Sequence, residues 1–294
     1  MTDLYEQISA MLDRSGVKDG AMLDDASYIH MLRHHETSGL DATLYRPLIC
    51  LFLQGAKEVG SSRRSVTVRA GQSLIVSHTL PVTSRITEAS EDRPYVAIVF
   101  PLDLDVLRTL APSVPPSSAF APSDPYSICQ FDTDPGLEDA LSRYCSQCQV
   151  PDTRAILAPI TLREIHARLL IGRHATGLQR LLWHESTASR ISLATRDIQT
   201  NLTESISIGD LAQRIGMSNS AFFEQFKAVT GTSPLQYQKD LRLLKARDAL
   251  RATGAKVSEI AFSVGYESSA QFSREYSRKF GKSPRQEREP ETVV

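Results

Sequence analysis

Histidine, cysteine and carboxylate side chains most often hold metals or carry out catalysis, and the densest such group in this chain is the segment YIHMLRHHE. It contains His30, His34, His35 and Glu36. Adjacent histidines on a strand point to opposite faces, so His34 and His35 cannot both join one metal site. We interpret these histidines, and the isolated His78, as structural or solvated, and we expect no metal site.

Cys145 and Cys148 have the C-x-x-C spacing of zinc and thiol-redox sites. No second C-x-x-C accompanies them, and both lie on an apolar stripe at helical spacing. We interpret them as core cysteines, with a redox sensor as the alternative. The sequence has no Gly-rich phosphate loop, Ser/His/Asp order or nucleophile elbow, so we expect no catalytic residues, no cofactor and no enzyme activity.

The chain has 294 residues and four cysteines, which is too few for a disulfide framework and fits reduced thiols. No apolar run approaches the roughly 20 residues that span a bilayer, and the start MTDLYEQISAMLDRSG lacks the pattern of a signal peptide. These features predict a cytoplasmic protein with no membrane partner.

The net charge of −1 conceals an asymmetry between the two parts of the chain. Residues 1–189 hold 17 basic and 22 acidic side chains, whereas residues 190–294 hold 16 basic and 12 acidic ones. A basic C-terminal part is consistent with an anionic partner such as nucleic acid.

The N-terminal part alternates short apolar runs with turn residues over residues 44–102, which is typical of an all-β barrel or sandwich. Apolar residues at helical spacing predict a helix near residues 4–12 and further helices after residue 135. The Pro-rich segment 111–125 is expected to be a loop because proline cannot donate to a sheet.

The C-terminal part contains an internal repeat. Apolar residues at i, i+3, i+4 and i+7 begin at Ile208 and again at Val257, 49 residues later. Each set is followed by a glycine, a Ser-containing turn, a second helix with aromatic anchors, and the sequence Gly-x-Ser-Pro. Two helices around a tight turn predict a helix-turn-helix, and two copies joined by the helix PLQYQKDLRLLKARDALRA are far more specific than one.

Positions two residues from an aromatic anchor lie about 200° around the helix and should face outward, toward DNA. Arg274 is the best candidate because its guanidinium can hold a guanine through two hydrogen bonds. Arg278 and Lys279 are expected to bind phosphates. The residues that we expect to contact DNA are Ser218, Asn219, Ser220, Phe223, Glu224, Lys227, Ser268, Ser269, Ala270, Gln271, Arg274 and Arg278.

The segments RLLKARDAL and KVSEIAFSVGYESSAQFSREYSRKFGKSPRQ resemble the C-terminal signature of the AraC/XylS family of bacterial transcription regulators. The preceding SISIGDLAQRIGMSNSAFFEQFKAVTGTSPLQY resembles that family's first helix-turn-helix, and RPLICLFLQGAKEV, AGQSL and LPVTSRITEAS are similar to the N-terminal domain of one subgroup. The family often has arginine where Glu224 stands, so the base preference of the first copy is open between a cytosine contact and a solvated role.

The resemblance implies an α+β two-domain protein, with a cupin-like β-barrel and flanking helices before an all-α domain with two helix-turn-helix motifs joined by a linker helix. We expect an effector-sensing and dimerisation domain at 1–184, a linker at 185–192, a DNA-binding domain at 193–287 with motifs at about 206–230 and 255–280, and a disordered tail at 288–294.

The resemblance also implies the partners. They are double-stranded DNA, an unknown small-molecule effector, a second copy of the chain, and RNA polymerase if the protein is an activator; when DNA-bound it would lie in the nucleoid. Dimer contact is assigned to Leu162, Ile165 and Leu169, which could equally pack against the barrel. A metalloenzyme of the cupin type or a redox sensor, fused to a DNA-binding domain, is the alternative function.

Overall fold

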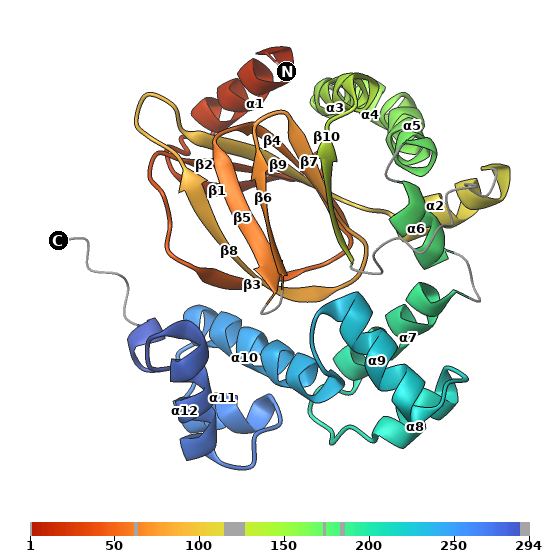
Figure 1. Cartoon of the computed structure of the whole chain (residues 1–294). Helices are drawn as coiled ribbons and strands as arrows, with labels where there is room; N and C mark the ends of the chain where they lie inside the picture. The colour runs from red at the N-terminus through yellow and green to blue at the C-terminus, as the bar shows by residue number, and fades with distance from the viewer. Residues whose placement is uncertain (1, 62–63, 115–126, 173–174, 183–185, 289–294) are drawn as a thin grey trace.

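The structure is a computed structural model that describes residues 2–61, 64–114, 127–172, 175–182 and 186–288 (Figure 1). Strands and a few helices fill the N-terminal part, and helices alone fill the C-terminal part. The expected α+β two-domain architecture is therefore confirmed.

The strands form two antiparallel sheets, of six and four strands. In order across the first sheet they are β1 (Gly20–Asp24), β2 (Ile29–His34), β9 (Tyr95–Pro101), β4 (Leu48–Gln54), β7 (Gln72–Val76) and β10 (Ile128–Asp132). Across the second they are β3 (Asp41–Tyr45), β8 (Leu80–Glu88), β5 (Ala56–Ser61) and β6 (Arg64–Arg69).

The expected cupin-like barrel is open rather than closed. Within the described residues no ladder joins the two sheets, so β3 and β6 end one sheet and β1 and β10 end the other. The six-stranded sheet is buried on both faces, which explains why β4 reads LICLFLQ without polar alternation. Ile49 and Leu51 face the helices, while Cys50 and Phe52 face the second sheet.

Helices cover the outer face of the six-stranded sheet (Figure 1). The helix predicted near residues 4–12 is confirmed as α1. The sequence did not indicate α4 or β10, and residues 115–125 of the Pro-rich segment lie outside the described residues. The N-terminal helices are α1 (Thr2–Arg14), α2 (Leu104–Leu110), the 3-10 turn η1 (Ala111–Ser113), α3 (Pro135–Cys148), α4 (Pro151–Ile156), α5 (Ala158–Ile171) and α6 (Ala175–Leu182).

The C-terminal helices follow the predicted repeat. They are α7 (Thr187–Thr200), α8 (Ile208–Arg214), α9 (Asn219–Thr230), α10 (Pro234–Ala252), α11 (Val257–Ser263), α12 (Ser269–Phe280) and the 3-10 turn η2 (Gln286–Arg288). Helices α8 and α9 form one helix-turn-helix, α11 and α12 form the other, and α10 joins them (Figure 1).

The boundaries expected between domains differ in detail from the structure. From Thr187 onward the expected linker is already part of α7, whose first turn is capped by the hydroxyl of Ser186. Residues 183–185 and the tail from 289 lie outside the described residues, and Arg288 ends η2.

The C-terminal helices dock directly on the sheets. The amide and hydroxyl of Ser127 donate to the carbonyl of Val229 at 3.2 and 2.8 Å, and the Tyr237 hydroxyl donates to the carbonyl of Thr79 at 2.7 Å. The apolar core between the sheets continues into the core of the first helix-turn-helix, whereas the second has a separate core.

Candidate nucleic-acid interface

The second helix of each motif, α9 and α12, is held by aromatic anchors as the sequence predicts. Phe222, Phe226, Phe272 and Tyr276 are fully buried. Phe226 also packs edge-on against Tyr237 of α10, with ring centroids 5.4 Å apart. This packing fixes which face of each helix is left for a partner.

Serine caps both of these helices at the N-terminus. The hydroxyls of Ser218 and Ser268 each accept a hydrogen bond from the backbone amide three residues on, at 3.3 Å. Both helices end at a left-handed glycine, Gly231 and Gly281. The remaining free amides of the first turns are available for anions such as DNA phosphates.

The residues expected to contact DNA lie mostly on the exposed faces of α9 and α12. Lys227 and Ser269 are half-buried, and the ammonium of Lys227 lies 6.0 Å from the ring centroid of the exposed Phe223. The exposed residues are Ser218, Asn219, Ser220, Phe223, Glu224, Ser268, Ala270, Gln271, Arg274 and Arg278.

Two arginines on α12 are free to meet an anion, but the neighbouring lysine is not. Arg274 and Arg278 are exposed and form no ion pair with any described residue. Lys279 instead pairs with Asp240 of α10 at 2.6 Å, and both side chains are largely buried. Lys279 thus joins α12 to α10, and the expectation that it binds phosphate stays a prediction.

The side chain of Gln271 also forms a hydrogen bond within the protein. Its amide donates to Glu275 at 3.2 Å, and Glu275 is further held by Lys239 and by the hydroxyl of Tyr266. These hydrogen bonds hold the pKa of Glu275 below its usual value against the opposing effect of burial. The second N–H and the carbonyl oxygen of the Gln271 side-chain amide have no partner among the described residues and are left for an adenine contact.

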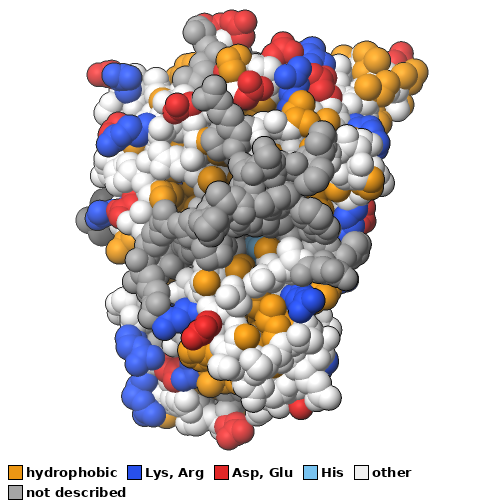
Figure 2. Space-filling model, turned by 45° about the vertical axis from the view of Figure 1, so that its right-hand side comes forward, with side chains coloured by type: hydrophobic (Ala, Val, Ile, Leu, Met, Phe, Trp, Pro, Cys, Tyr) orange, Lys and Arg blue, Asp and Glu red, His pale blue; other side chains and the backbone are white. Residues whose placement is uncertain are grey.

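The surface of the helical half carries much of the positive charge. Figure 2 shows Lys and Arg side chains gathered along one edge of the lower half of the molecule, where Figure 1 places the C-terminal helices.

A cavity of about 630 Å³ opens between the two sheets, beside the edge strand β3. Its volume lies in the usual range of small-molecule sites. The walls are mainly apolar, with Leu32, Ile86, Tyr95 and Val99 among the side chains that line it.

Comparison with known proteins assigns both parts of the chain. Residues 26–176 match the model of the family described as the AraC-type transcriptional regulator N-terminus. The chain belongs to the AraC family of transcriptional regulators. Residues 211–290 match a helix-turn-helix domain.

The curated relatives each match less than half of this AraC-family chain. The HTH-type transcriptional activator RhaS of Escherichia fergusonii is 34% identical over 134 residues, which are 45% of this chain and 48% of RhaS. RhaS of Escherichia coli K12 is 33% identical over 118 residues, 40% of this chain and 42% of RhaS. The chain thus spans less than half the length of these relatives.

Solved structures share the whole architecture. ToxT of Vibrio cholerae strain SCE256 with a bound unsaturated fatty acid has a TM-score of 0.59 at 10% identity, covering 88% of this chain and 92% of that one. ToxT of Vibrio cholerae O395 gives 0.56 at 10% identity, covering 90% and 98%. At this identity the likeness shows the AraC-family fold alone.

The histidines behave as structural groups in this AraC-family domain. His78 is buried and bonds to the hydroxyls of Ser77 and Ser127 and to the carbonyl of Ala188, each at 2.9 Å. Burial lowers its pKa to about 4. His35 contacts Asp19 at 3.0 Å. Among the described residues no three metal-ligating side chains come together.

The two cysteines of the C-x-x-C motif lie in the core between α3 and the sheet, as expected. Burial raises the pKa of Cys145 to about 12 and also raises that of Cys148. Reactive cysteines need thiolate character, so this environment gives no support to a redox sensor.

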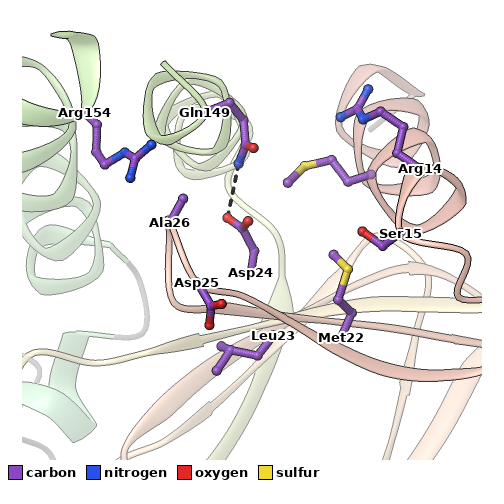
Figure 3. Close-up of a pocket in the computed structure, with 10 residues that line it drawn as sticks. Arg14, Ser15, Met22, Leu23, Asp24, Asp25, Ala26, Gln149 and Arg154 are labelled. Carbon is purple, nitrogen blue, oxygen red and sulfur yellow. Dashed lines mark hydrogen bonds between the residues drawn. The ribbon is translucent and has the colours of Figure 1, made fainter. Parts of the chain in front are cut away.

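A second hollow lies between α1, the turn after β1 and α4. Figure 3 shows Arg14 and Arg154 on opposite sides of it, with Asp24 between them. Asp24 accepts hydrogen bonds from Gln149 at 3.2 Å and from the amide of Ser27 at 3.0 Å, and therefore holds the β1–β2 turn. Positive and negative side chains both line this hollow, and we assign Asp24 a structural role in the turn.

The three residues assigned to dimer contact differ in how deeply they are buried. Ile165 and Leu169 are buried in the chain's own core, so the packing alternative applies to them, and Leu162 is half-buried against the same core. Exposed apolar side chains lie nearby, at Ile156, Leu157 and Ile160.

None of the helices in the described part of the chain is long and apolar enough to cross a membrane. The charged residues of the cavity, Asp41, Arg46 and Lys57, were not predicted from the sequence. For Lys57 the sequence does hold an indication. Lys57 and the apolar Val59 are two residues apart on a strand and therefore share a face.

Proposed function

We propose that this protein is a sequence-specific DNA-binding transcription regulator whose activity depends on a small molecule bound between its two sheets. The observation that carries the proposal is the pair of serine-capped helices, α9 and α12, with buried anchors and exposed polar faces. Two such helices on one connector suit successive major grooves, about 34 Å apart.

The test of DNA binding is in vitro selection of bound sequences with the full-length protein, followed by footprinting. We expect protection over about two helical turns and an affinity that falls steeply with salt, since phosphate contacts supply much of the binding energy. Arg93→Ala is the control for Arg274→Ala, because it removes the same charge from an exposed loop of the N-terminal domain. No enrichment of any sequence would contradict the proposal.

The effector role is supported by the cavity and by the bound fatty acid of ToxT, which has the same fold. An effector acts by binding one arrangement of the two domains more tightly than another. The RhaS relatives are described as activators, which favours activation and contact with RNA polymerase. DNA binding would place the protein in the nucleoid, in the cytoplasm.

We also propose a homodimer that buries the exposed apolar side chains of α4 and α5 rather than Ile165 and Leu169. Ile156 and Ile160 are 68% and 65% exposed. Sedimentation of Ile156→Glu should show a shift toward monomer relative to the unchanged protein. Leu40→Glu is the matched control, because Leu40 is equally exposed at 70% but lies in the loop before β3. An unchanged sedimentation coefficient in Ile156→Glu would place the contact elsewhere.

A metalloenzyme is the weaker candidate, because the family to which the chain belongs consists of regulators. Metal analysis of the purified protein separates the two, since stoichiometric iron, manganese or zinc would favour the enzyme.

A further inference from the structure

Lys57 of β5 stands on the inner face of its sheet, where apolar side chains are expected. In the antiparallel ladders it lies opposite Val68 on one side and Ile86 on the other, and residues directly opposite share a face. Val68 and Ile86 are both buried in the core between the sheets. The neighbouring residue, Glu58, faces outward and pairs with Arg85 at 2.7 Å.

Lys57 lines the intersheet cavity and has no hydrogen bond or ion pair with any described residue. Its charge reaches the opposite sheet. Burial raises the pKa of Cys50 on β4 to about 12, and the ammonium of Lys57 acts in the opposite direction. A half-buried cation among apolar walls is costly unless a counter-charge accompanies it.

The cavity supplies no free counter-charge of its own. Asp41 is the one carboxylate among its described lining residues, and Asp41 is held by Arg247 of α10 at 2.6 Å. Burial lowers the pKa of His34, Asp19 opposes that effect and Lys57 adds to it; a histidine is neutral or positive and in neither form balances the charge of Lys57. The electrostatics of the cavity therefore call for an anion.

We propose that the intersheet cavity binds an organic monoanion, with its carboxylate on the ammonium of Lys57 and its hydrocarbon body against the apolar walls. The inference rests on the proposed effector role and names the chemical class of the effector.

The lining argues against two other classes of ligand. A sugar needs a hydrogen-bonding partner for most of its hydroxyls. Although Ser38, Thr43 and Ser84 line the cavity, its surface is more apolar than polar. A nucleotide carries several negative charges, whereas only one inward cation, Lys57, is free within the described part of the cavity; Arg46 lines it from an exposed position at its edge.

The test uses full-length protein and titration calorimetry with matched probes. Decanoate is compared with 1-decanol, 1-naphthoate with 1-naphthylmethanol, and glucose is included as a sugar. We expect each carboxylate to bind about tenfold or more tightly than its alcohol, as for a hydrogen bond to a charged group. Lys57→Met, which keeps the length of the side chain, should abolish that preference.

Lys18→Met is the matched control, because Lys18 is 71% exposed and lies outside the cavity. If Lys57→Met does not fold, Lys57→Gln replaces it. Equal affinity for carboxylate and alcohol, binding of glucose alone, no binding of any probe, or a preference that survives at Lys57→Met would each overturn the inference. The in vitro selection of DNA does not depend on these calorimetric results. If the monoanion proposal fails, the proposed DNA binding is still tested by that selection.

Discussion

Arg274 and Arg278 lie one turn apart on the outer face of α12, and we expect their charges to serve different purposes. Arg274 lies in the N-terminal half of α12, and in helix-turn-helix proteins the N-terminal residues of the recognition helix contact the base edges. Arg278 is in the last turn, where the backbone of the DNA is the nearer partner. Neither is tied to another described residue, so both can be tested without disturbing the fold.

Arg274→Ala should weaken binding to the selected site by about 1–3 kcal/mol and relax the preference at one base pair. Arg278→Ala should instead weaken binding to all sequences alike and lower the salt slope by about one. Binding isotherms on the selected site and on its single-base variants distinguish the two. An unchanged base preference in Arg274→Ala would show that this residue does not read a base.

At the scale of elements, the two glycines that follow α11 and α12 of the second motif differ in how closely the chain approaches them. Gly265 has a φ of +90°, and a Cβ there would lie 2.8 Å from the Cα and carbonyl oxygen of Thr203. Gly281 has a φ of +73° and open space around it. Left-handed backbone and close approach together make glycine necessary at Gly265, whereas only the backbone conformation favours it at Gly281.

Gly265→Ala should therefore lower the free energy of unfolding by about 2 kcal/mol or more, and Gly281→Ala by about 1 kcal/mol. Gly254→Ala, at a position with neither constraint, should change little. Urea denaturation of the three variants gives the ranking. Equal losses at Gly265 and Gly281 would mean that Thr203 moves aside without cost.

The contact between the loop after β7 and α7 depends on a neutral histidine. Because a carbonyl only accepts, the Nε2 of His78 must donate to Ala188. Its Nδ1 is left to accept from the hydroxyl of Ser77, since the single hydroxyl proton of Ser127 is donated to the carbonyl of Val229. The folded pKa of about 4 lies below the ordinary value of 6.5. The unfolded chain thus binds a proton more readily, and stability is full above the ordinary pKa and falls as the pH drops toward the folded one.

When the pH is lowered from about 7.5 to 5, this histidine should reduce the free energy of unfolding by about 2 kcal/mol. In His78→Gln that part of the pH dependence should vanish, while Gln can still donate to Ala188. The measurement is the difference in urea midpoints between the two proteins across this range, which cancels the contribution of carboxylates. Parallel pH profiles would rule out a buried neutral His78.

Much of the helical half follows from the sequence, because local patterns specify it. The spacing from Ile208 and Val257 and the aromatic anchors predict α8 to α12 without knowledge of packing. The short strand β10 and helix α4 carry no such periodicity and exist because tertiary contacts favour them. The ion pair of Lys279 with Asp240 could not be predicted, since no local pattern brings α12 to α10.

At the scale of the whole molecule, Arg247 of α10 joins the two domains. Its guanidinium is 6% exposed, pairs with Asp41 at 2.6 Å, donates to the carbonyl of Ala42, and lies 4.8 Å from the ring centroid of Phe280. Asp41 also lines the intersheet cavity. Arg247 is therefore one connection between the cavity and the second motif, beside the packing of α10 and α12 on β3.

Arg247→Met should loosen the docking of α10 on β3 and raise the rate of hydrogen exchange there. The reason is that methionine keeps the volume but loses the ion pair and both hydrogen bonds. Arg251→Met is the matched control, since Arg251 pairs with Glu287 inside the C-terminal domain. If exchange in β3 were the same in both variants, Arg247 would not hold the domains together.

Because β3 lies at the edge of its sheet, the N-terminal domain should behave differently when it is separated from the C-terminal domain. An edge strand presents unpaired backbone groups that can recruit a strand from another molecule, unless something covers them. Here α10 packs on β3 and Arg247 occupies the carbonyl of Ala42. An isolated N-terminal domain would lose this cover, so it should aggregate at concentrations where the full-length chain stays dispersed.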